Sequence, residues 1–233
     1  MKKLVILTGA GMSSESGIRT FRDSGGLWEE YDVTEVATPM AWWKNRDLVL
    51  RFYNERRRQL ADCKPNAGHT GLAELEKHFD VQIITQNVDN LHERAGSTKI
   101  LHLHGELTKA RSTSDLSLIY DIEYKDINPG DNCEKGSQLR PHIVWFGEAV
   151  PMMDEAVSIT ATADIFIVIG TSMVVYPAAG LINDVPDKAE KYIIDKKIPP
   201  LGLFSHLTTI EDSAVNGVPG IVNKLLTDRY CVA

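Results

Sequence analysis

Four short runs of the sequence place glycine or polar side chains directly after an apolar stretch. Residues 9–17 read GAGMSSESG, and glycines at such a place let backbone N–H groups approach a phosphate because no Cβ stands in the way. Residues 85–92 read TQNVDNLH, residues 170–172 read GTS, and residues 103–106, LHGE, add the imidazole of His104. Four such runs together are hard to explain by packing alone.

Two of these runs also have a simpler structural explanation. The glycine run is not the ordinary dinucleotide motif G-x-G-x-x-G, because Ser14 stands where the third glycine would be. A tight turn without a ligand is the alternative for this run. A single His such as His104 is more often a satisfied structural residue than a base.

The elements that must position these runs are buried strands. Continuous apolar stretches are typical of a parallel sheet covered by helices on both faces, and they predict strands over 4–8, 81–85, 100–103 and 165–169. Ligands of such sheets bind at the carboxyl ends of the strands, where all four runs lie.

Helices and a further strand complete the predicted order. Residues 47–60 are rich in helix formers, Asn66 is a candidate cap for a helix that ends near Phe79, and residues 217–226 indicate a closing helix. A further strand is expected over 191–194. Strands alternating with helices predict an α/β protein with a doubly wound sheet, and the polar stretch 112–138 predicts a small inserted module.

Composition narrows the function class. The chain has 233 residues, 43% hydrophobic, and a net charge of −7, which argues against a protein that mainly binds nucleic acid. Cys63, Cys133 and Cys231 are too far apart for a disulfide framework or a thiolate metal site. The apolar runs are too short for a signal peptide or a membrane span, so we expect a cytoplasmic protein without a membrane partner.

The motifs, taken in order, resemble those of the sirtuins. The matching runs are GAGMSSESG at 9–17, GIRTFR at 17–22, TQNVD at 85–89, HG at 104–105, WFGE at 145–148 and GTS at 170–172. The resemblance extends from residue 4 to about residue 225. It implies an NAD-consuming lysine deacylase on a Rossmann-like domain (1–30, 66–111 and 149–233) with a small inserted domain (31–65 and 112–148).

The resemblance also implies roles for individual residues. His104 would be the general base and Asn87 a second catalytic residue, since a neutral imidazole with a pKa of about 6.5 accepts a proton at physiological pH. The other cofactor-binding residues would be Gly9, Ala10, Gly11, Ser14, Glu15, Ile18, Phe21, Arg22, Trp28, Gln86, Asp89, Gly170, Thr171, Ser172, Asp195, Ser213 and Ala214.

The segment 144–148 would bind the substrate, an acylated lysine in a protein or peptide. The resemblance implies a strand-like edge on which the peptide adds as an extra strand, with Val144, Phe146, Gly147 and Glu148 in contact with it. An ordinary core strand with Trp145 and Phe146 buried is the alternative.

Tyr53 and Arg56 predict which acyl group is removed. They are three residues apart, so on a helix they share one face and could bind one carboxylate. They match the tyrosine and arginine that sirtuins of the desuccinylase group present to acidic acyl chains, which implies succinyl and malonyl lysine as substrates, with residual deacetylation. Without the resemblance, a Tyr and an Arg in a basic helix usually form a solvated face.

Two departures from the family pattern change the expected ligands. Most sirtuins hold a structural zinc on two C-x-x-C pairs, but residues 111–115 read RSTSD and only Cys133 precedes residues 139–141, so we predict no zinc. Asp195 stands where the family commonly has Asn. Its charge would repel a 2′-phosphate, which favours NAD over NADP.

Two other functions are compatible with these residues. The set Asn87, Asp89 and His104 would also serve a sirtuin-like ADP-ribosyltransferase. A non-catalytic NAD-sensing protein is the third hypothesis.

Overall fold

The computed structural model describes residues 1–20, 31–200 and 202–230, of which 228–230 are described by their backbone only. Its main sheet is parallel and has the strand order β3-β2-β1-β7-β8-β9. The strands are β1 (Lys3–Thr8), β2 (Asp80–Thr85), β3 (Ile100–His102), β7 (Ile165–Ile169), β8 (Glu190–Asp195) and β9 (Leu207–Glu211). This order is the Rossmann order, so the predicted doubly wound α/β sheet is confirmed.

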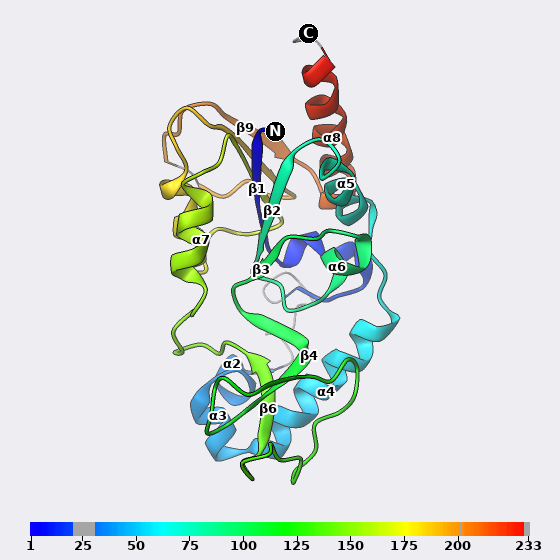
Figure 1. Ribbon diagram of the computed structural model, residues 1–233, viewed down its shortest axis with the longest axis vertical. Coiled ribbons are helices and arrows are strands. Elements are labelled where there is room, and N and C mark those ends of the chain that lie inside the picture. The colour runs from blue at the N-terminus through cyan, green and yellow to red at the C-terminus, as the bar shows by residue number, and fades with distance from the viewer. Residues whose placement is uncertain (21–30, 201, 231–233) are drawn as a thin grey trace.

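Helices cover both faces of this sheet, which explains the continuous apolar strands. In β1, Leu4 and Ile6 pack against α5 (Ala67–Leu75) and α8 (Ala214–Tyr230) on one face. Val5 and Leu7 point to the other face, toward α7 (Met153–Thr160) and the 3-10 helix η3 (Ala178–Asp184). In Figure 1, α7 lies to the left of the sheet and α5 and α8 lie to its right.

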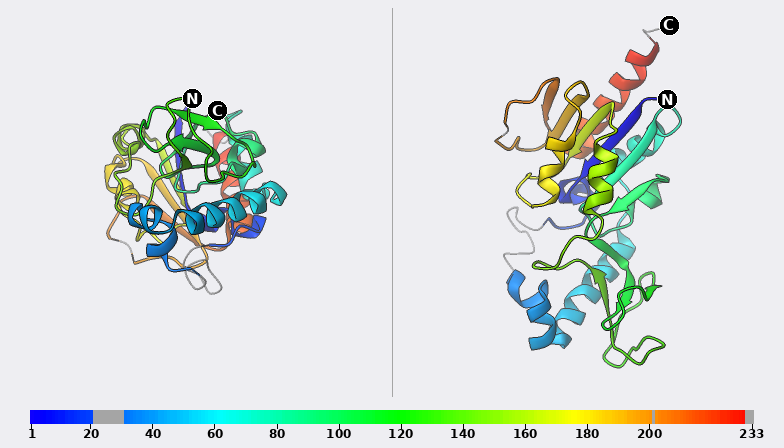
Figure 2. Two further views of the ribbon diagram at one scale, coloured as in Figure 1. Left: turned by 90° about the horizontal axis from the view of Figure 1, so that it is seen from below. Right: turned by 60° about the vertical axis from the view of Figure 1, so that its left-hand side comes forward.

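A smaller part of the molecule lies beyond the carboxyl ends of the strands. It contains the antiparallel strands β4 (Gly105–Ser112), β5 (Ile119–Asp121) and β6 (Leu139–Ile143), in the order β5-β4-β6. The helices α2 (Val33–Val36), α3 (Pro39–Lys44) and α4 (Arg46–Asp62) pack on this sheet around a separate apolar core. Figure 2 shows the two parts stacked end to end.

The boundary between the two parts differs from the sequence-based range. Strand β4 hydrogen-bonds to β5 and β6, whereas residues 66–111 are expected in the large domain. We therefore propose that the division falls near Gly105 rather than at residue 111. No helix in the described part of the chain has the length and apolar character needed to cross a bilayer.

The cap predicted at Asn66 is confirmed, and it joins two elements. The Asn66 side chain accepts from the N–H groups of Gly68 and His69 at the start of helix α5. This helix ends at Leu75, four residues before the predicted end. Its Nδ2 group donates to the carbonyl of Met12, which lies in the 3-10 helix η1 (Ala10–Met12) after β1. The start of α5 is thereby fixed to the glycine run.

Candidate active site

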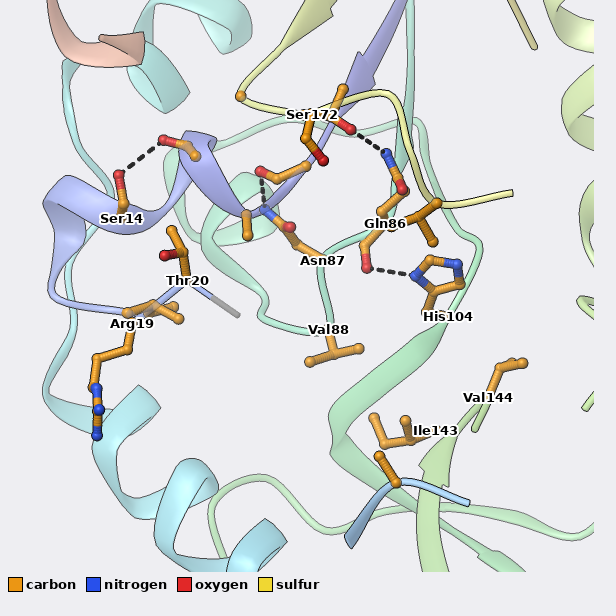
Figure 3. Close-up of a pocket in the computed structure, with 18 of the residues that line it drawn as sticks. Ser14, Arg19, Thr20, Gln86, Asn87, Val88, His104, Ile143, Val144 and Ser172 are labelled. Carbon is orange, nitrogen blue, oxygen red and sulfur yellow. Dashed lines mark hydrogen bonds between the residues drawn. The ribbon is translucent and has the colours of Figure 1, made fainter. Parts of the chain in front are cut away.

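A cavity of about 690 Å³ opens between the two parts of the molecule, at the carboxyl ends of the main sheet. The ends of β1, β2, β7 and β8 contribute to its wall, as does helix α4 from the small part. Figure 3 shows its centre. Most predicted site residues line this one cavity: Gly9, Ala10, Gly11, Ser14, Ile18, Tyr53, Arg56, Gln86, Asn87, His104, Val144, Phe146, Gly147, Glu148, Gly170, Thr171, Ser172, Asp195, Ser213 and Ala214.

The glycines at residues 9, 11 and 170 allow two loops to meet where the strand order reverses. The Gly11 N–H donates to the Gly170 carbonyl at 2.8 Å, and a Cβ on Gly9 would lie 2.7 Å from that oxygen. Gly170 itself has a φ of +62°. The reversal between β1 and β7 is the place where open α/β sheets bind their ligands.

Asn87 is held from several sides by hydrogen bonds. Its side-chain Nδ2 donates to the Gly9 carbonyl at 2.9 Å and to the Ser13 hydroxyl at 3.2 Å. Its backbone N–H donates to the Thr85 hydroxyl at 3.0 Å. Because both side-chain N–H groups are used, the side-chain carbonyl is the polar atom that Asn87 can offer to a ligand.

Ser13 is a residue of this site that the sequence analysis did not select. It is buried, and its hydroxyl contacts Asn87 and interacts with the Asp89 carboxyl. Ser14, which was selected, lines the cavity while its hydroxyl donates to the Gly11 carbonyl at 3.1 Å. The run GAGMSSESG contains three serines, and only the turn after β1 determines which of them points inward.

The side chains of Asp89 and Glu15 accept hydrogen bonds from backbone N–H groups. The Asp89 carboxyl is buried and accepts from the Leu91 N–H at 3.1 Å, and burial raises its pKa although its hydrogen bonds oppose the shift. Glu15 accepts from the Val215 N–H at 3.3 Å and pairs with Lys196 at 3.6 Å. Neither side chain lines the cavity, and their contact with the cofactor stays a prediction.

The cavity has a second group of predicted residues near its other end. Asp195 is the last residue of β8, and its carboxylate accepts from the Lys197 N–H at 3.0 Å. Ser213 and Ala214 line the same end. The predicted cofactor residues Phe21, Arg22 and Trp28 lie outside the residues that the structure describes.

His104 is held as one tautomer by the backbone. Its Nδ1 lies 2.9 Å from the Gln86 carbonyl, which can only accept, so Nδ1 carries the proton (Figure 3). Burial lowers the pKa of His104, although the hydrogen bond to Gln86 opposes the shift. The ring is therefore neutral at pH 7, and Nε2 is left unprotonated to accept a proton from a ligand.

A second histidine, His102, contacts the backbone carbonyl of Asn87, the residue after Gln86. Its Nδ1 lies 3.3 Å from the Asn87 carbonyl and its Nε2 lies 2.7 Å from the Glu93 carboxylate. Burial alone would lower the pKa of His102, but Glu93 raises it on balance. Consecutive carbonyls after β2 are thus contacted by two imidazoles whose pKa values are shifted in opposite directions.

Residues 144–148 do not form a core strand, so that alternative is wrong. They make a turn after β6, in which Trp145 is buried and Phe146 is 46% exposed, and peptide binding along them stays a prediction. The N–H groups of Val144, Phe146 and Glu148 already donate to carbonyls of the chain. The Glu148 carboxylate accepts from Arg140 at 2.8 Å, and this charged pair stabilises the turn.

Tyr53 and Arg56 do not form a solvated face. Both lie on α4, they are 4% and 8% exposed, and both line the cavity that holds His104. Burial raises the pKa of Tyr53 to about 12, so its hydroxyl is protonated at neutral pH. The helix therefore brings one hydroxyl donor and one guanidinium to the same wall.

Hydroxyl groups and an ion pair lie where the resemblance implies a structural zinc site. The Cys133 thiol donates to the Ser112 hydroxyl at 3.3 Å, and Asp115 pairs with Lys135 at 2.6 Å. Within the described residues, no group of three or more His, Cys, Asp or Glu is placed to hold a metal. These residues do not fit a structural zinc, which is bound by four ligands that are mostly thiolate or imidazole.

The sheet order and the glycine loops at the switch point define an α/β protein of the Rossmann-like class. Residues 9–177 match the Sir2 family. The chain is 55% identical to an NAD-dependent protein deacylase of Helicobacter pylori, over 97% of this chain and 98% of that protein. It is 59% identical to a protein of the same name from Bacteroides thetaiotaomicron, over 97% and 99%. The chain therefore belongs to the Sir2 family, the sirtuins.

Solved structures give the same result. A Sir2 homologue in complex with NAD matches with a TM-score of 0.88 at 39% identity, over 97% of this chain and 90% of that one. An ADP-ribose complex of a mutant Sir2 homologue matches with a TM-score of 0.91 at 39% identity, over 98% and 94%.

Proposed function

We propose that this protein is an NAD-dependent protein-lysine deacylase that removes succinyl and malonyl groups, and acetyl groups more slowly. Its products would be the free lysine, nicotinamide and O-acyl-ADP-ribose. The observation that carries the acyl preference is the presence of Tyr53 and Arg56 in the same cavity as His104 and Asn87. Relatives at 55% and 59% identity are named NAD-dependent protein deacylases, which supports the reaction class.

The residues around the cavity fit NAD. The glycine loops after β1 and β7 would hold the pyrophosphate, because a Cβ at Gly9 or Gly170 is excluded by the opposite backbone. Gln86 and Asn87 would contact the nicotinamide ribose. Asp195, Ser213 and Ala214 would contact the adenosine, where the Asp195 charge favours NAD over NADP.

When bound, NAD supplies the sugar carbon that receives the acyl oxygen as nicotinamide leaves. His104 would accept a proton at Nε2 from a ribose hydroxyl, since Nδ1 is occupied by the Gln86 carbonyl. Asn87 would offer its side-chain carbonyl as an acceptor and thereby orient the sugar.

The acylated peptide would reach the cavity beside residues 144–148. Because several N–H groups of this turn are already used, we propose that the peptide pairs mainly with its carbonyl groups. Phe146, 46% exposed, and Gly147 would cover the lysine side chain as it enters.

An acidic acyl chain explains the two polar side chains on α4. A carboxylate taken out of water is destabilised unless it is paired, and the buried guanidinium of Arg56 with the hydroxyl of Tyr53 would pair it. An acetyl group has no charge to pair, so it would gain nothing from either residue.

A panel of acyl peptides, incubated with NAD and followed by mass spectrometry, tests this proposal. We expect a higher kcat/KM on succinyl and malonyl peptides than on the acetyl peptide. In the variant Tyr53→Phe/Arg56→Met, the succinyl-to-acetyl ratio of kcat/KM should fall by roughly 30-fold or more, because hydrogen bonds to a charge are lost. An unchanged ratio would refute the acyl assignment.

The same spectra separate the competing functions. Free peptide with acylated ADP-ribose supports deacylation, whereas ADP-ribose attached to protein supports the ADP-ribosyltransferase. The absence of any nicotinamide release that depends on acyl peptide would favour the non-catalytic hypothesis.

A further inference from the structure

The Tyr53 hydroxyl is contacted from behind by the indole of Trp145. The Trp145 Nε1–H donates to the Tyr53 oxygen at 3.0 Å, and both side chains are buried. An indole nitrogen can only donate, so the Tyr53 oxygen is the acceptor in this pair. The Tyr53 proton must then point elsewhere, and it is donated to no other residue in the part of the chain that the structure describes.

The Trp145 indole is itself fixed by charged groups of the small sheet. The Arg140 guanidinium lies 3.3 Å from the centre of the indole ring. Arg140 is held in turn by two hydrogen bonds to Glu148, at 2.8 and 3.0 Å, and Glu148 also accepts from the Trp145 backbone N–H at 2.8 Å. The direction of the indole N–H is therefore set before any ligand binds.

We infer that Trp145 is a specificity-determining positioning residue: by donating to the Tyr53 oxygen, it directs the Tyr53 proton into the cavity, toward the carboxylate of an acidic acyl chain. This inference rests on the proposed acyl preference. A chain of donors that runs from indole to phenol to carboxylate strengthens each hydrogen bond in it. An acetyl group offers no carboxylate, so the effect of Trp145 is specific to acidic acyl groups.

A purely structural role for Trp145 is the alternative. A buried indole N–H requires a partner in any case, and the Tyr53 oxygen would satisfy it without any effect on substrates. The two roles predict different results when the indole N–H is removed. Only the specificity-determining role lowers the succinyl-to-acetyl ratio of kcat/KM.

The test compares Trp145→Phe with a matched control. In Trp145→Phe, we expect the succinyl-to-acetyl ratio of kcat/KM to fall about fivefold, mainly through a higher KM for the succinyl peptide. The control is Trp42→Phe, because Trp42 is equally buried, packs on Trp145 at 5.8 Å, and its Nε1 has no hydrogen-bond partner among the described residues. Trp42→Phe should leave the ratio unchanged.

A double-mutant cycle tests whether Trp145 acts on the substrate preference through the Tyr53 hydroxyl. In a Tyr53→Phe background, Trp145→Phe should change the ratio no further, because the hydroxyl through which it acts is gone. If Trp145→Phe lowers kcat/KM on both peptides by the same factor, the inference is overturned. If the variant Tyr53→Phe/Arg56→Met leaves the ratio unchanged, the proposed acyl preference fails, and this outcome is distinct from the first.

A second replacement covers the case in which Trp145→Phe does not fold. Benzothienylalanine at position 145 keeps the shape of the indole and has sulfur in place of the ring N–H. The same fall in ratio is expected with this residue, and a ratio equal to that of the unmodified protein would overturn the inference.

Discussion

A backbone carbonyl, that of Gln86, decides which nitrogen of His104 can act as a base. The hydrogen bond of 2.9 Å to Nδ1 holds the proton there, and Nε2 is left to accept one. The neighbouring His102 has acceptors at both nitrogens, at 3.3 and 2.7 Å, and the Glu93 carboxylate raises its pKa. Two histidines separated by one residue thus have different tasks because their acceptors differ.

Removal of the His104 imidazole is predicted to abolish turnover without unfolding the protein. In His104→Ala, kcat should fall by roughly 100-fold or more, which is the usual contribution of a positioned base. NAD binding, measured by calorimetry, and the melting temperature should change little by comparison. A variant with more than about half of the normal kcat would contradict the role of His104 as the base.

The pH dependence of the reaction should follow the neutral form of His104. Burial lowers its pKa below the ordinary value, so the active neutral ring persists to lower pH than in water. We expect kcat/KM to be constant near neutral pH and to fall about tenfold per pH unit on an acid limb that lies below about pH 6.5. An acid limb centred above pH 7 would show that another group controls the reaction.

At the scale of elements, the start of α5 joins the sheet to the glycine run. Asn66 caps the helix and also donates to the Met12 carbonyl, and the His69 Nδ1 accepts from the Asn66 N–H at 3.3 Å. His69 is fully buried, and this burial lowers its pKa to about 4. Protonation of His69 would remove an acceptor on which the cap depends.

This arrangement predicts loss of stability in mild acid. An unfolded His has a pKa of about 6.5, so the stabilisation is complete above that pH and is lost as the pH falls toward the folded value of about 4. It amounts to at most about 3 kcal/mol of unfolding free energy. In His69→Gln, the amide still accepts from Asn66 and does not titrate.

Urea unfolding at about pH 7 and pH 4.5 measures this difference. Between these two pH values, the unfolding free energy of the wild type should fall by about 1–3 kcal/mol more than that of His69→Gln. His92 and His142 also have lowered pKa values, but they titrate in both proteins and so cancel from the comparison. An equal fall in unfolding free energy in both proteins would show that His69 does not contribute to the acid sensitivity.

Elements with a strong local pattern were predictable, and elements set by long-range pairing were not. The apolar run 165–169 is β7 to the residue, because both of its faces are buried and every position carries the signal. Residues 144–148 carry a similar apolar signal, yet they form a turn in which Glu148 pairs with Arg140 of the preceding strand β6. Strand β9 was not predicted, since its residues are largely exposed.

At the scale of the molecule, polar contacts connect segments of the small part in the region where the family resemblance implies a zinc site. Ser112 at the end of β4 contacts Cys133, and Ser114 contacts Ser137 at 2.6 Å across the same gap. The apolar core around Trp145 lies directly beside this region. We therefore expect packing and hydrogen bonds, rather than a metal, to stabilise this region.

Chelation should consequently have no effect on this protein. After prolonged incubation with EDTA, the melting temperature and kcat should equal those of the untreated sample, because the residues that the structure describes contain no group of ligands placed to bind zinc. Elemental analysis of purified protein should give well below one zinc per chain. One tightly held zinc per chain, with a lower melting temperature after its removal, would contradict this expectation.

The sequence alone determined the sheet class and the runs that contribute to the site, because apolar strands and the turns after them are local patterns. Only the tertiary structure decided which polar groups meet. Ser13 and not Ser14 contacts Asn87, and Trp145, 92 positions from Tyr53, donates to its hydroxyl. Such pairs depend on the angle at which loops from distant strands leave the sheet, and no local pattern of residues encodes that angle.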